Sequence, residues 1–499
     1  MESFTRNTER HGKEGKALDD ADVDNAKLFL DGTLINGELD VPLGKVRRLI
    51  DWRIIPIMFC CYTLQFLDKV ILNYAAVMGL GQDLELQGND FSNANTFTFV
   101  ALLIAEIPNG WILNKMAAGR WLGLNVFAWG ISTACVAAAR NYVHLLIARI
   151  FLGIFEASIG PCLMIISSQW YTKSEQPIRF AFWYTGLGIG QIVGALTSFG
   201  FQHVQSPAFS GWRIMFVILG IITSIVGVIT YFSIPDSPMT AAWLTNTEKH
   251  ALLKHIQSNK TGISNNHFKW SHLRELATDV QVYLLILMLT LLSTTAGVTT
   301  VYSSTILRNV GFNPKQAALL NAPSGVVSIV STPLAGYLVR RGGRRWIWIP
   351  VCVSPAIVGG ALMSFVQGKG GVLSGVWLVN TTVATLPMIY QWLSANVAGH
   401  TKRPFAMALL AGSFNVGNII GPQTFQARDA PQYIPAKVTV FTTLAAGAVC
   451  APLLKLYYQW ENRRRDKRDE QQVDMAVDTT DQDWQNLTDK ENRGFRYVL

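Results

Sequence analysis

Twelve runs of about 20 mostly apolar residues follow one another along this chain, and they constrain its fold more than any other feature. Each run is long enough to cross a lipid bilayer as a helix. Only 15% of the residues are charged, against roughly 25% in soluble domains, which argues against a soluble enzyme. We therefore expect an all-α integral membrane protein with 12 transmembrane helices. The runs are 52–75, 92–113, 121–139, 142–167, 179–201, 212–234, 281–305, 316–338, 346–366, 372–394, 405–426 and 437–459.

A long polar stretch separates the first six runs from the last six. It covers residues 235–280 and opens with Pro235-Asp236-Ser237-Pro238, which stops a helix. The remaining connections are short, and both chain ends are polar. We expect a disordered cytoplasmic N-terminal tail (1–50), a six-helix bundle (51–234), a cytoplasmic central loop (235–280), a second six-helix bundle (281–460) and a cytoplasmic C-terminal tail (461–499) that also looks disordered.

The net charge of +9 arises in the membrane-spanning part of the chain. Residues 51–460 hold 26 basic and 13 acidic groups, whereas each tail has a slight acidic excess. With both termini in the cytoplasm, 17 of the 26 basic residues fall on the cytoplasmic side and 7 outside, as the positive-inside rule requires. The charge therefore indicates membrane topology and a lipid bilayer as the surrounding partner. We expect a plasma membrane location and no nucleic-acid partner.

The two halves repeat one another with a near-constant offset. Asp51 before the first run matches Asp279 before the seventh, and Gly110 after the second matches Gly336 after the eighth. The third match is between Gly190-Gln191-x-x-Gly194 and Gly417-Asn418-x-x-Gly421. Parallel repeats of six helices describe the major facilitator fold, in which a site at the membrane midplane lies between two rocking halves.

Five acidic or basic residues fall well inside the predicted spans, away from their ends: Asp68, Lys69, Glu106, Arg149 and Glu156. Each would cost about 2.5–3.5 kcal/mol at a lipid-exposed helix centre, so we expect them to face the bundle interior. Charged groups in that position commonly mark substrate or proton pathways.

Arg149 and Glu156 lie two helical turns apart on one face of the fourth span. Their spacing of about 10 Å along the axis leaves each free for another partner. We hypothesise that Arg149 binds a substrate carboxylate and that Glu156 takes up and releases the coupling proton. The alternative is an ion network that only packs helices.

The first span carries a polar stripe of Tyr62, Gln65, Lys69 and Asn73. This pattern is typical of a face that lines a cavity, where Lys69 would offer a second positive charge to an anion. Asp68 points about 100° away and is expected to pair with a neighbouring helix. The alternative for Asp68 and Lys69 is a pair that reaches the membrane interface.

Three further residues complete the candidate set. Glu106 is a possible gating or second protonation site, and a fixed partner for loop arginines is the alternative. Asn415 and Asn418 precede an expected helix break at Gly421-Pro422 and are candidates for substrate binding; the alternative is interhelical hydrogen bonding. Together with Glu156 and Asp68, Glu106 forms the predicted proton-coupling set.

Several motifs resemble those of the major facilitator superfamily. Gly336-Tyr-Leu-Val-Arg340-Arg341-Gly342-Gly343-Arg344-Arg345 is similar to its loop signature G-x-x-x-D-R-x-G-R-R, with Arg340 in place of the usual Asp. The first-half copy, Gly110-Trp-Ile-Leu-Asn114-Lys115-Met-Ala-Ala-Gly119-Arg120, is degenerate. The resemblance implies a conformational gate formed by Gly110, Lys115, Arg120, Gly336, Arg340, Arg341, Gly343 and Arg344.

A narrower resemblance covers nearly the whole chain apart from the tails. It rests on Leu67-Asp68-Lys69-x-x-Leu-Asn73, Ala105-Glu106-Ile-Pro108-Asn109, Arg149-x-x-Leu152-Gly153-x-x-Glu156-Ala157, Gly211-Trp212-Arg213 and Pro235-Asp236-Ser-Pro238. These motifs are similar to those of the fungal anion:cation symporters of the allantoate permease group. The resemblance implies proton-coupled uptake of a small organic anion, such as a carboxylate, vitamin or ureide.

Other classes of function fit less well. The six cysteines lie in apolar runs without metal-ligand spacing, so we expect neither a metal nor a cofactor. A membrane enzyme would need a catalytic motif such as DDxxD, HxxxxD or GxSxG, and none is present. An exporter of a metabolite or drug-like compound is the nearest alternative, and a transporter-like substrate sensor is a third. We expect a monomer.

Overall fold

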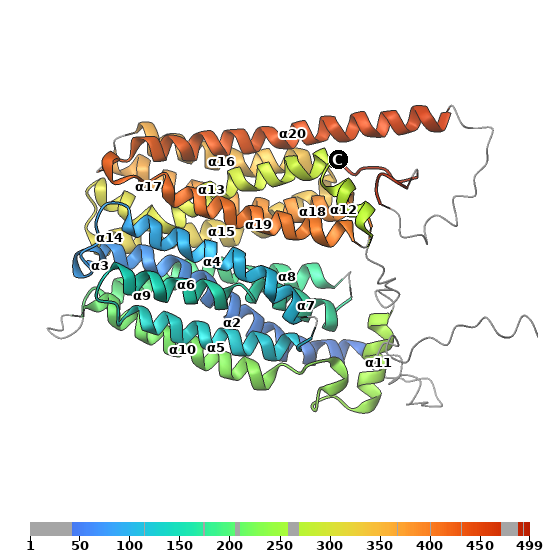
Figure 1. Cartoon of the computed structure of the whole chain (residues 1–499), viewed down its shortest axis with the longest axis horizontal. Coiled ribbons are helices and arrows are strands. Elements are labelled where there is room, and N and C mark those ends of the chain that lie inside the picture. Colours follow the sequence, from blue (N-terminus) through green and yellow to red (C-terminus); the bar gives the residue numbers. More distant parts are fainter. Residues whose placement is uncertain are drawn as a thin grey trace, which may run out of the picture.

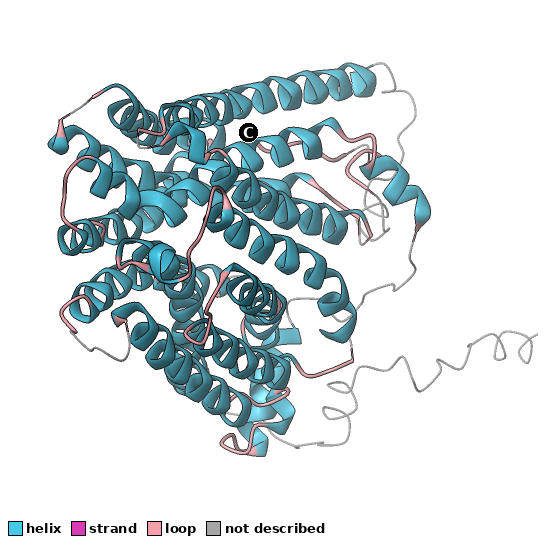
Figure 2. Cartoon of the chain, turned by 60° about the vertical axis from the view of Figure 1, so that its left-hand side comes forward, coloured by secondary structure: helices cyan, strands magenta, loops and turns pink. Residues whose placement is uncertain are grey.

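The computed structural model describes residues 42–499 apart from 114, 173–174, 205–209, 258–268, 367, 400, 431, 471–487 and 493. The expectation of a disordered N-terminal tail falls almost wholly outside the described residues. Throughout the described part of the chain the regular structure is helical and no strand is present, as Figure 2 shows. The expected all-α class is therefore confirmed.

The first half contains the six predicted spans, two of them divided. The fourth span is α6 followed by α7, and the fifth is α8 followed by α9, with the interruption at Thr185. The bounds are α2 Leu43–Val77, α3 Leu80–Asp83, α4 Asp90–Leu113, α5 Ala118–Val136, α6 Tyr142–Glu156, α7 Ile159–Trp170, α8 Gln176–Tyr184, α9 Gly186–Phe201 and α10 Gly211–Ser233.

The second half repeats this order, and short helices lie between the halves. The predicted central loop contains η2 Pro238–Thr240, α11 Asn246–Gln257 and α12 Trp270–Leu276, so it is not a continuous coil. The second-half bounds are α13 Val280–Asn309, α14 Pro314–Leu319, α15 Ala322–Gly342, α16 Arg345–Phe365, α17 Lys369–Val379, η3 Asn380–Ala384, α18 Thr385–Asn396, α19 Lys402–Gln423, η4 Ala427–Asp429 and α20 Ile434–Glu470.

Each of the twelve predicted runs coincides with one helix or with two or three consecutive helices. Within the described residues, ten helical segments are long and apolar enough to cross a membrane. The other two predicted spans are α5 and the α8–α9 pair. In Figure 1 the long helices run side by side. We call the end with α11 and the last turns of α20 the termini end, and the end with α3 and α14 the opposite end.

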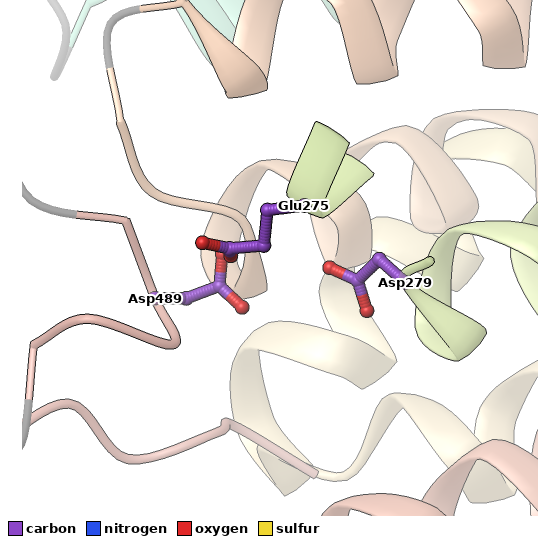
Figure 3. A group of neighbouring side chains, drawn as sticks. All are labelled: Glu275, Asp279 and Asp489. Carbon is purple, nitrogen blue, oxygen red and sulfur yellow. The ribbon is translucent and has the colours of Figure 1, made fainter. Parts of the chain in front are cut away.

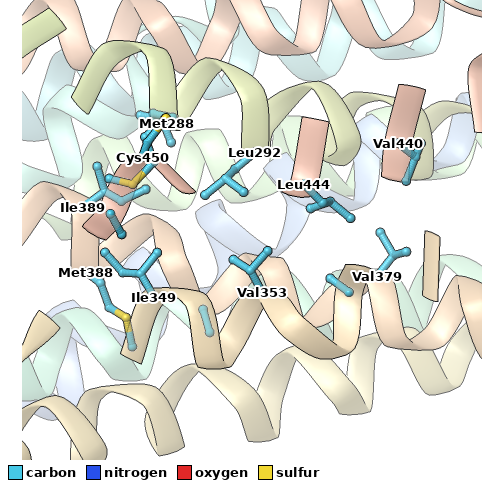
Figure 4. Packing of buried hydrophobic residues seen from close by; sticks show 14 of the residues in the cluster. Met288, Leu292, Ile349, Val353, Val379, Met388, Ile389, Val440, Leu444 and Cys450 are labelled. Carbon is cyan, nitrogen blue, oxygen red and sulfur yellow. The ribbon is translucent and has the colours of Figure 1, made fainter. Parts of the chain in front are cut away.

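Separate hydrophobic cores support the two halves. One cluster draws all its buried members from residues 276–497, and Figure 4 shows part of it, where α13, α16 and α20 meet. Two other clusters take theirs from residues 46–252 and, apart from Ala318, from 67–219. Each half therefore packs mainly upon itself, which suits a molecule whose halves move as units.

The repeat predicted from sequence reappears as a pair of corresponding ion pairs at the termini end. In the first half, the Asp51 carboxylate accepts bonds of 2.8 and 3.1 Å from Arg179 near the start of α8. In the second half, Asp279 lies 2.6 Å from the Nζ of Lys402, the first residue of α19. Both contacts join the start of the first helix of a half to the start of its fifth span.

The C-terminal tail differs from the expectation of a disordered segment. Helix α20 continues to Glu470, well past the predicted span end. Residues 488–492 and 494–499 then fold back against the second half, where Tyr497 is 3% exposed and Asp489 is fully buried. The expectation overlooked this segment because its polar composition conceals specific long-range contacts.

Candidate functional site

Two ion pairs join α2 to α6 within the first half. The Nζ of Lys69 lies 2.8 Å from Oε1 of Glu156, and Arg149 approaches Asp68 with NH1 and Oδ2 3.7 Å apart. Consecutive residues of α2 thus contact two residues of α6 that lie two turns apart. The two ion pairs bring together four of the five predicted intramembrane charges, and the formal charges of these four residues cancel.

The Arg149–Asp68 pair is the more deeply buried of the two. Arg149 is 2% exposed, and its Nε donates to the hydroxyl of Thr98 over 3.1 Å. Thr133 donates to the other oxygen of Asp68 over 3.0 Å. Asp68 therefore pairs with neighbouring helices, as expected. The Arg149 guanidinium is only partly engaged, because Nε bonds to Thr98 while NH1 has no hydrogen-bond partner and reaches Asp68 only at 3.7 Å.

Close packing of small residues places Arg149 beside α4. A Cβ added at Gly153 would lie 2.3 Å from the backbone oxygen of Thr98. Gly153 therefore allows α6 to approach α4 closely enough for Arg149 to reach the Thr98 hydroxyl.

Lys69 and Glu156 form the more accessible pair. The Lys69 side chain is 19% exposed, while that of Glu156 is 1% exposed. Gln65 donates to the same Glu156 oxygen over 3.1 Å. Two members of the predicted polar stripe thus converge on one carboxylate.

The other members of the stripe have different surroundings. Tyr62 packs against Trp183 and Tyr184, with ring centroids 4.9 and 5.4 Å away. Asn73 donates to the Ser303 hydroxyl of α13 over 2.8 Å, and its oxygen accepts from the Ser304 backbone N–H over 3.1 Å. Asn73 therefore joins the two halves.

Glu106 also joins the halves. Its Oε1 accepts a hydrogen bond of 3.0 Å from Asn415 of α19. Asn418 instead donates to the Phe414 oxygen of its own helix over 2.8 Å. The two asparagines predicted together for substrate binding therefore make different kinds of contact.

Hydrogen bonds between the two halves gather near the opposite end of the bundle. Ser92 of α4 bonds to the Tyr302 hydroxyl, and the Tyr302 ring stacks on Phe425 at 4.1 Å. Gln423 donates to Asn93 over 3.1 Å and to Thr96 over 2.8 Å. These contacts close the opposite end, and the Lys69–Glu156 pair lies between them and the termini end.

The predicted gating-loop residues all lie near the termini end. Arg120 contacts Asp236 at 2.9 Å, and Lys115 lies 4.1 Å from the Trp111 ring centre. Gly343 ends α15 with φ +62°, a backbone conformation that favours glycine. The others in this set occupy exposed positions: Gly110, Gly336, Arg340, Arg341 and Arg344.

A buried charge cluster in the second half was missed from sequence. Lys402 is the first residue of α19, and its side chain is fully buried. Its Nζ lies 2.6–2.7 Å from carboxylates of Glu275, Asp279 and Asp489. Figure 3 shows the three carboxylates, which come from α12, the start of α13 and the C-terminal segment. Their grouping resembles a metal site, but the Lys402 ammonium lies among them.

The only sequence signal for this cluster was the match of Asp279 to Asp51. It identified the aspartate but not its partners, because Asp489 lies 87 residues from Lys402 along the chain. A raised pKa for Asp489, caused mainly by burial and opposed by Lys402, accompanies this placement.

The fold and the charged interior define a multi-pass membrane transporter of the kind built from two helical halves. Residues 58–422 match the model of the Major Facilitator Superfamily, and the chain belongs to that family. It is a transporter and not an enzyme.

Curated relatives are fungal transporters that align over most of the chain. The chain is 37% identical over 461 residues to the Saccharomyces cerevisiae protein named thiamine pathway transporter THI73, covering 91% of this chain and 86% of that protein. It is 30% identical over 469 residues to the allantoate permease of the same organism, with the same coverage.

Solved structures of similar fold have low sequence identity. A D-xylose–proton symporter has a TM-score of 0.62 and 16% identity, covering 81% of this chain and 97% of that one. A bacterial homologue of the human lysosomal transporter Spinster, inward-facing and occupied, has a TM-score of 0.61 and 16% identity, with coverage of 81% and 96%. These likenesses support the fold alone.

Proposed function

We propose that this protein couples the uptake of a small organic anion to the entry of protons by alternating access. In this proposal both termini are cytoplasmic and the protein lies in the plasma membrane. The observation that carries the proposal is the Lys69–Glu156 ion pair, in which a partly accessible ammonium is held by a buried carboxylate. The name of one relative, allantoate permease, supports an organic anion as the substrate.

The coupling follows from competition for one positive charge. A buried charge left without a partner is strongly unfavourable, so Lys69 must contact either Glu156 or another anion. Protonation of Glu156 removes its negative charge and releases the ammonium. A substrate carboxylate can then bind to Lys69, and the neutral sum of charges is restored. One proton and one monovalent anion move together in this scheme.

Gln65 and Tyr62 extend this site along α2. Gln65 bonds to Glu156 when the carboxylate is charged and can turn to a substrate oxygen when it is not. Tyr62 lies two turns from Lys69 on the same helix face. We propose that both line the path of the substrate between the halves.

Arg149 takes a different role from the one first expected. Its contacts with Asp68 and Thr98 favour a positioning role that fixes α6 against α2 and α4. We therefore assign the first anion contact to Lys69 rather than to Arg149. Asp68 is assigned to holding Arg149 rather than to proton transfer.

Contacts between the halves supply the moving parts. Rocking of one half against the other has to break Asn73–Ser303 and Glu106–Asn415, since each bond joins the two halves. We propose that Glu106 is a gating contact whose protonation weakens the bond to Asn415. The exposed loop cations Arg340, Arg341 and Arg344 would act at the termini end when that end closes.

Proteoliposomes that contain a trapped pH dye test this function directly. Small carboxylates, with allantoate among them, and matched neutral amides are added outside in separate runs. We expect a carboxylate to acidify the interior while its amide does not. Accumulation of a carboxylate without a pH change, or proton exit when a cation enters, would contradict the proposal.

A further inference from the structure

The last residues of the chain are hydrogen-bonded to the second half at several points. We call residues 488–499, of which all but residue 493 are described, the C-terminal hook. Arg465 of α20 donates through NH1 to the backbone oxygens of Asp489 and Phe495, over 2.9 and 3.0 Å. Its NH2 donates to the Tyr497 hydroxyl over 3.1 Å. One buried guanidinium thus fixes three points of the hook.

The end of the hook is bound by α18. The Val498 N–H donates to Asn396 over 2.7 Å, and the Val498 oxygen accepts from Asn396 over 2.9 Å and from Trp392 over 3.0 Å. The Tyr497 N–H donates to Asn462 over 3.0 Å. The backbone N–H groups of both hook residues are therefore protected while the hook is docked.

The start of the hook completes the Lys402 cluster. Asp489 provides one of the three carboxylates around Lys402, and Lys490 lies 3.7 Å from Asp279. Four carboxylates and two ammonium groups therefore meet where the hook begins, because Glu491 also accepts from the Thr488 backbone N–H over 3.0 Å. Any further negative charge here would have no cation of its own.

The Thr488 hydroxyl lies directly beside the carboxylates of this cluster. Its hydroxyl donates to Oε2 of Glu275 over 2.7 Å and accepts from the Glu491 N–H over 3.1 Å. The residue is fully buried. A phosphoryl group on this oxygen would remove the donor and add nearly two negative charges beside Glu275 and Asp489.

The sequence around Thr488 is acidic. Asp489 and Glu491 follow it, and Asp478, Asp481 and Asp483 precede it. The 17 residues from 471 to 487 join the hook to α20, which is enough chain for the hook to leave without disturbing the helix.

We propose that Thr488 is a phosphorylation site and that its modification keeps the C-terminal hook undocked. The Thr488 oxygen attacks the γ-phosphorus of a nucleoside triphosphate bound to a protein kinase. The bond from that phosphorus to the β–γ bridging oxygen breaks, the hydroxyl proton passes to the kinase, and a nucleoside diphosphate leaves. Because Thr488 is buried in the docked hook, modification takes place on the released form and prevents redocking.

Hydrogen exchange of the full-length transporter tests this inference. The protein in lipid nanodiscs is treated with ATP and an acid-directed serine/threonine kinase, and phosphorylation and amide exchange are mapped by mass spectrometry. We expect phosphate on Thr488 and at least tenfold faster exchange at the amides of Tyr497 and Val498. The substitution T488E should reproduce the faster exchange.

Three controls keep the outcome specific. T480E adds the same charge outside the hook and should exchange like the wild type, while T488V removes the hydroxyl without adding charge and should exchange more slowly than T488E. K402M loosens the hook and should raise the rate of Thr488 phosphorylation, with unchanged exchange in α4 and α6 as the check on folding. Exchange in T488E equal to that in T480E, or an unmodified Thr488 even in K402M, would overturn the inference.

Discussion

The Nζ of Lys69 lies 2.8 Å from Oε1 of Glu156, and this contact ties the last third of α2 to the last residue of α6. Replacement of Lys69 by Met should weaken anion binding, because charge-assisted hydrogen bonds contribute about 1.5–3 kcal/mol. That corresponds to a rise of roughly 10- to 100-fold in the half-saturation concentration for uptake. The conservative change K69R should retain part of the affinity. An unchanged half-saturation concentration in K69M would exclude Lys69 as the anion contact.

The Arg149–Asp68 pair should matter more for stability than for affinity. R149M leaves the Asp68 carboxylate buried without its cation, and loss of one partner of a buried pair costs about 3–5 kcal/mol. Thermal unfolding in detergent should show a marked fall in midpoint for R149M. The double variant R149M/D68L should recover most of it, since neither charge then remains. A wild-type midpoint for R149M alone would contradict the positioning role.

Gly153 and Gly160 form a matched pair for testing the helix packing beside the site. Alanine is a better helix former than glycine by about 1 kcal/mol at either position. At Gly160 a Cβ meets no atom within 4 Å, so G160A should be neutral or stabilising. At Gly153 it would lie 2.3 Å from the Thr98 oxygen, so G153A should lower the unfolding midpoint. Equal midpoints for the two variants would show that α4 and α6 are not in close contact.

The lowered pKa of Glu175 predicts that the stability of the termini end depends on pH. Burial alone would raise its pKa, but hydrogen bonds from Arg47, Thr172 and His255 outweigh burial and lower the pKa to about 2. A carboxyl with a lowered native pKa adds stability above pH 4.5, and that stability disappears as the pH falls toward 2.

Unfolding midpoints of the wild type and E175Q should therefore differ at pH 6, and the difference should shrink as the pH falls from 4.5 toward 2. The bond from Arg47 to Glu175 joins α2 to the start of α8, so its loss should lower the stability of the folded first half. Chemical unfolding followed by fluorescence measures that stability independently of heating. A gap that widens on acidification would mean that Glu175 is not stabilised in its charged form.

The sequence predicted the features that depend on local composition and periodicity. Apolar runs located the spans because a bilayer requires about 20 such residues whatever their neighbours are. The sequence also matched Asp51 to Asp279, and in the structure each of the two forms an ion pair at the corresponding place in its half. The five intramembrane charges could be identified from composition alone, because a charged residue within an apolar run is rare.

Pairing could not be predicted, because it depends on how helices turn toward each other. The contacts of Arg149 with Thr98 and Asp68 depend on the packing of α6 on α4 and α2, which the spacing of residues along α6 does not reveal. The burial of Lys402 could not be predicted either, because it depends on Asp489, 87 residues away. Such long-range contacts leave no periodic signal.

The exchange of Lys69 between Glu156 and the substrate is tested most directly by E156Q. The amide imitates the protonated carboxyl, so this variant should still bind the anion but should carry no coupling proton. In proteoliposomes, exchange of labelled for unlabelled carboxylate should persist and be independent of pH between about 5 and 8, and net uptake should produce no internal acidification. Proton entry at the wild-type ratio in E156Q would contradict the proposed coupling.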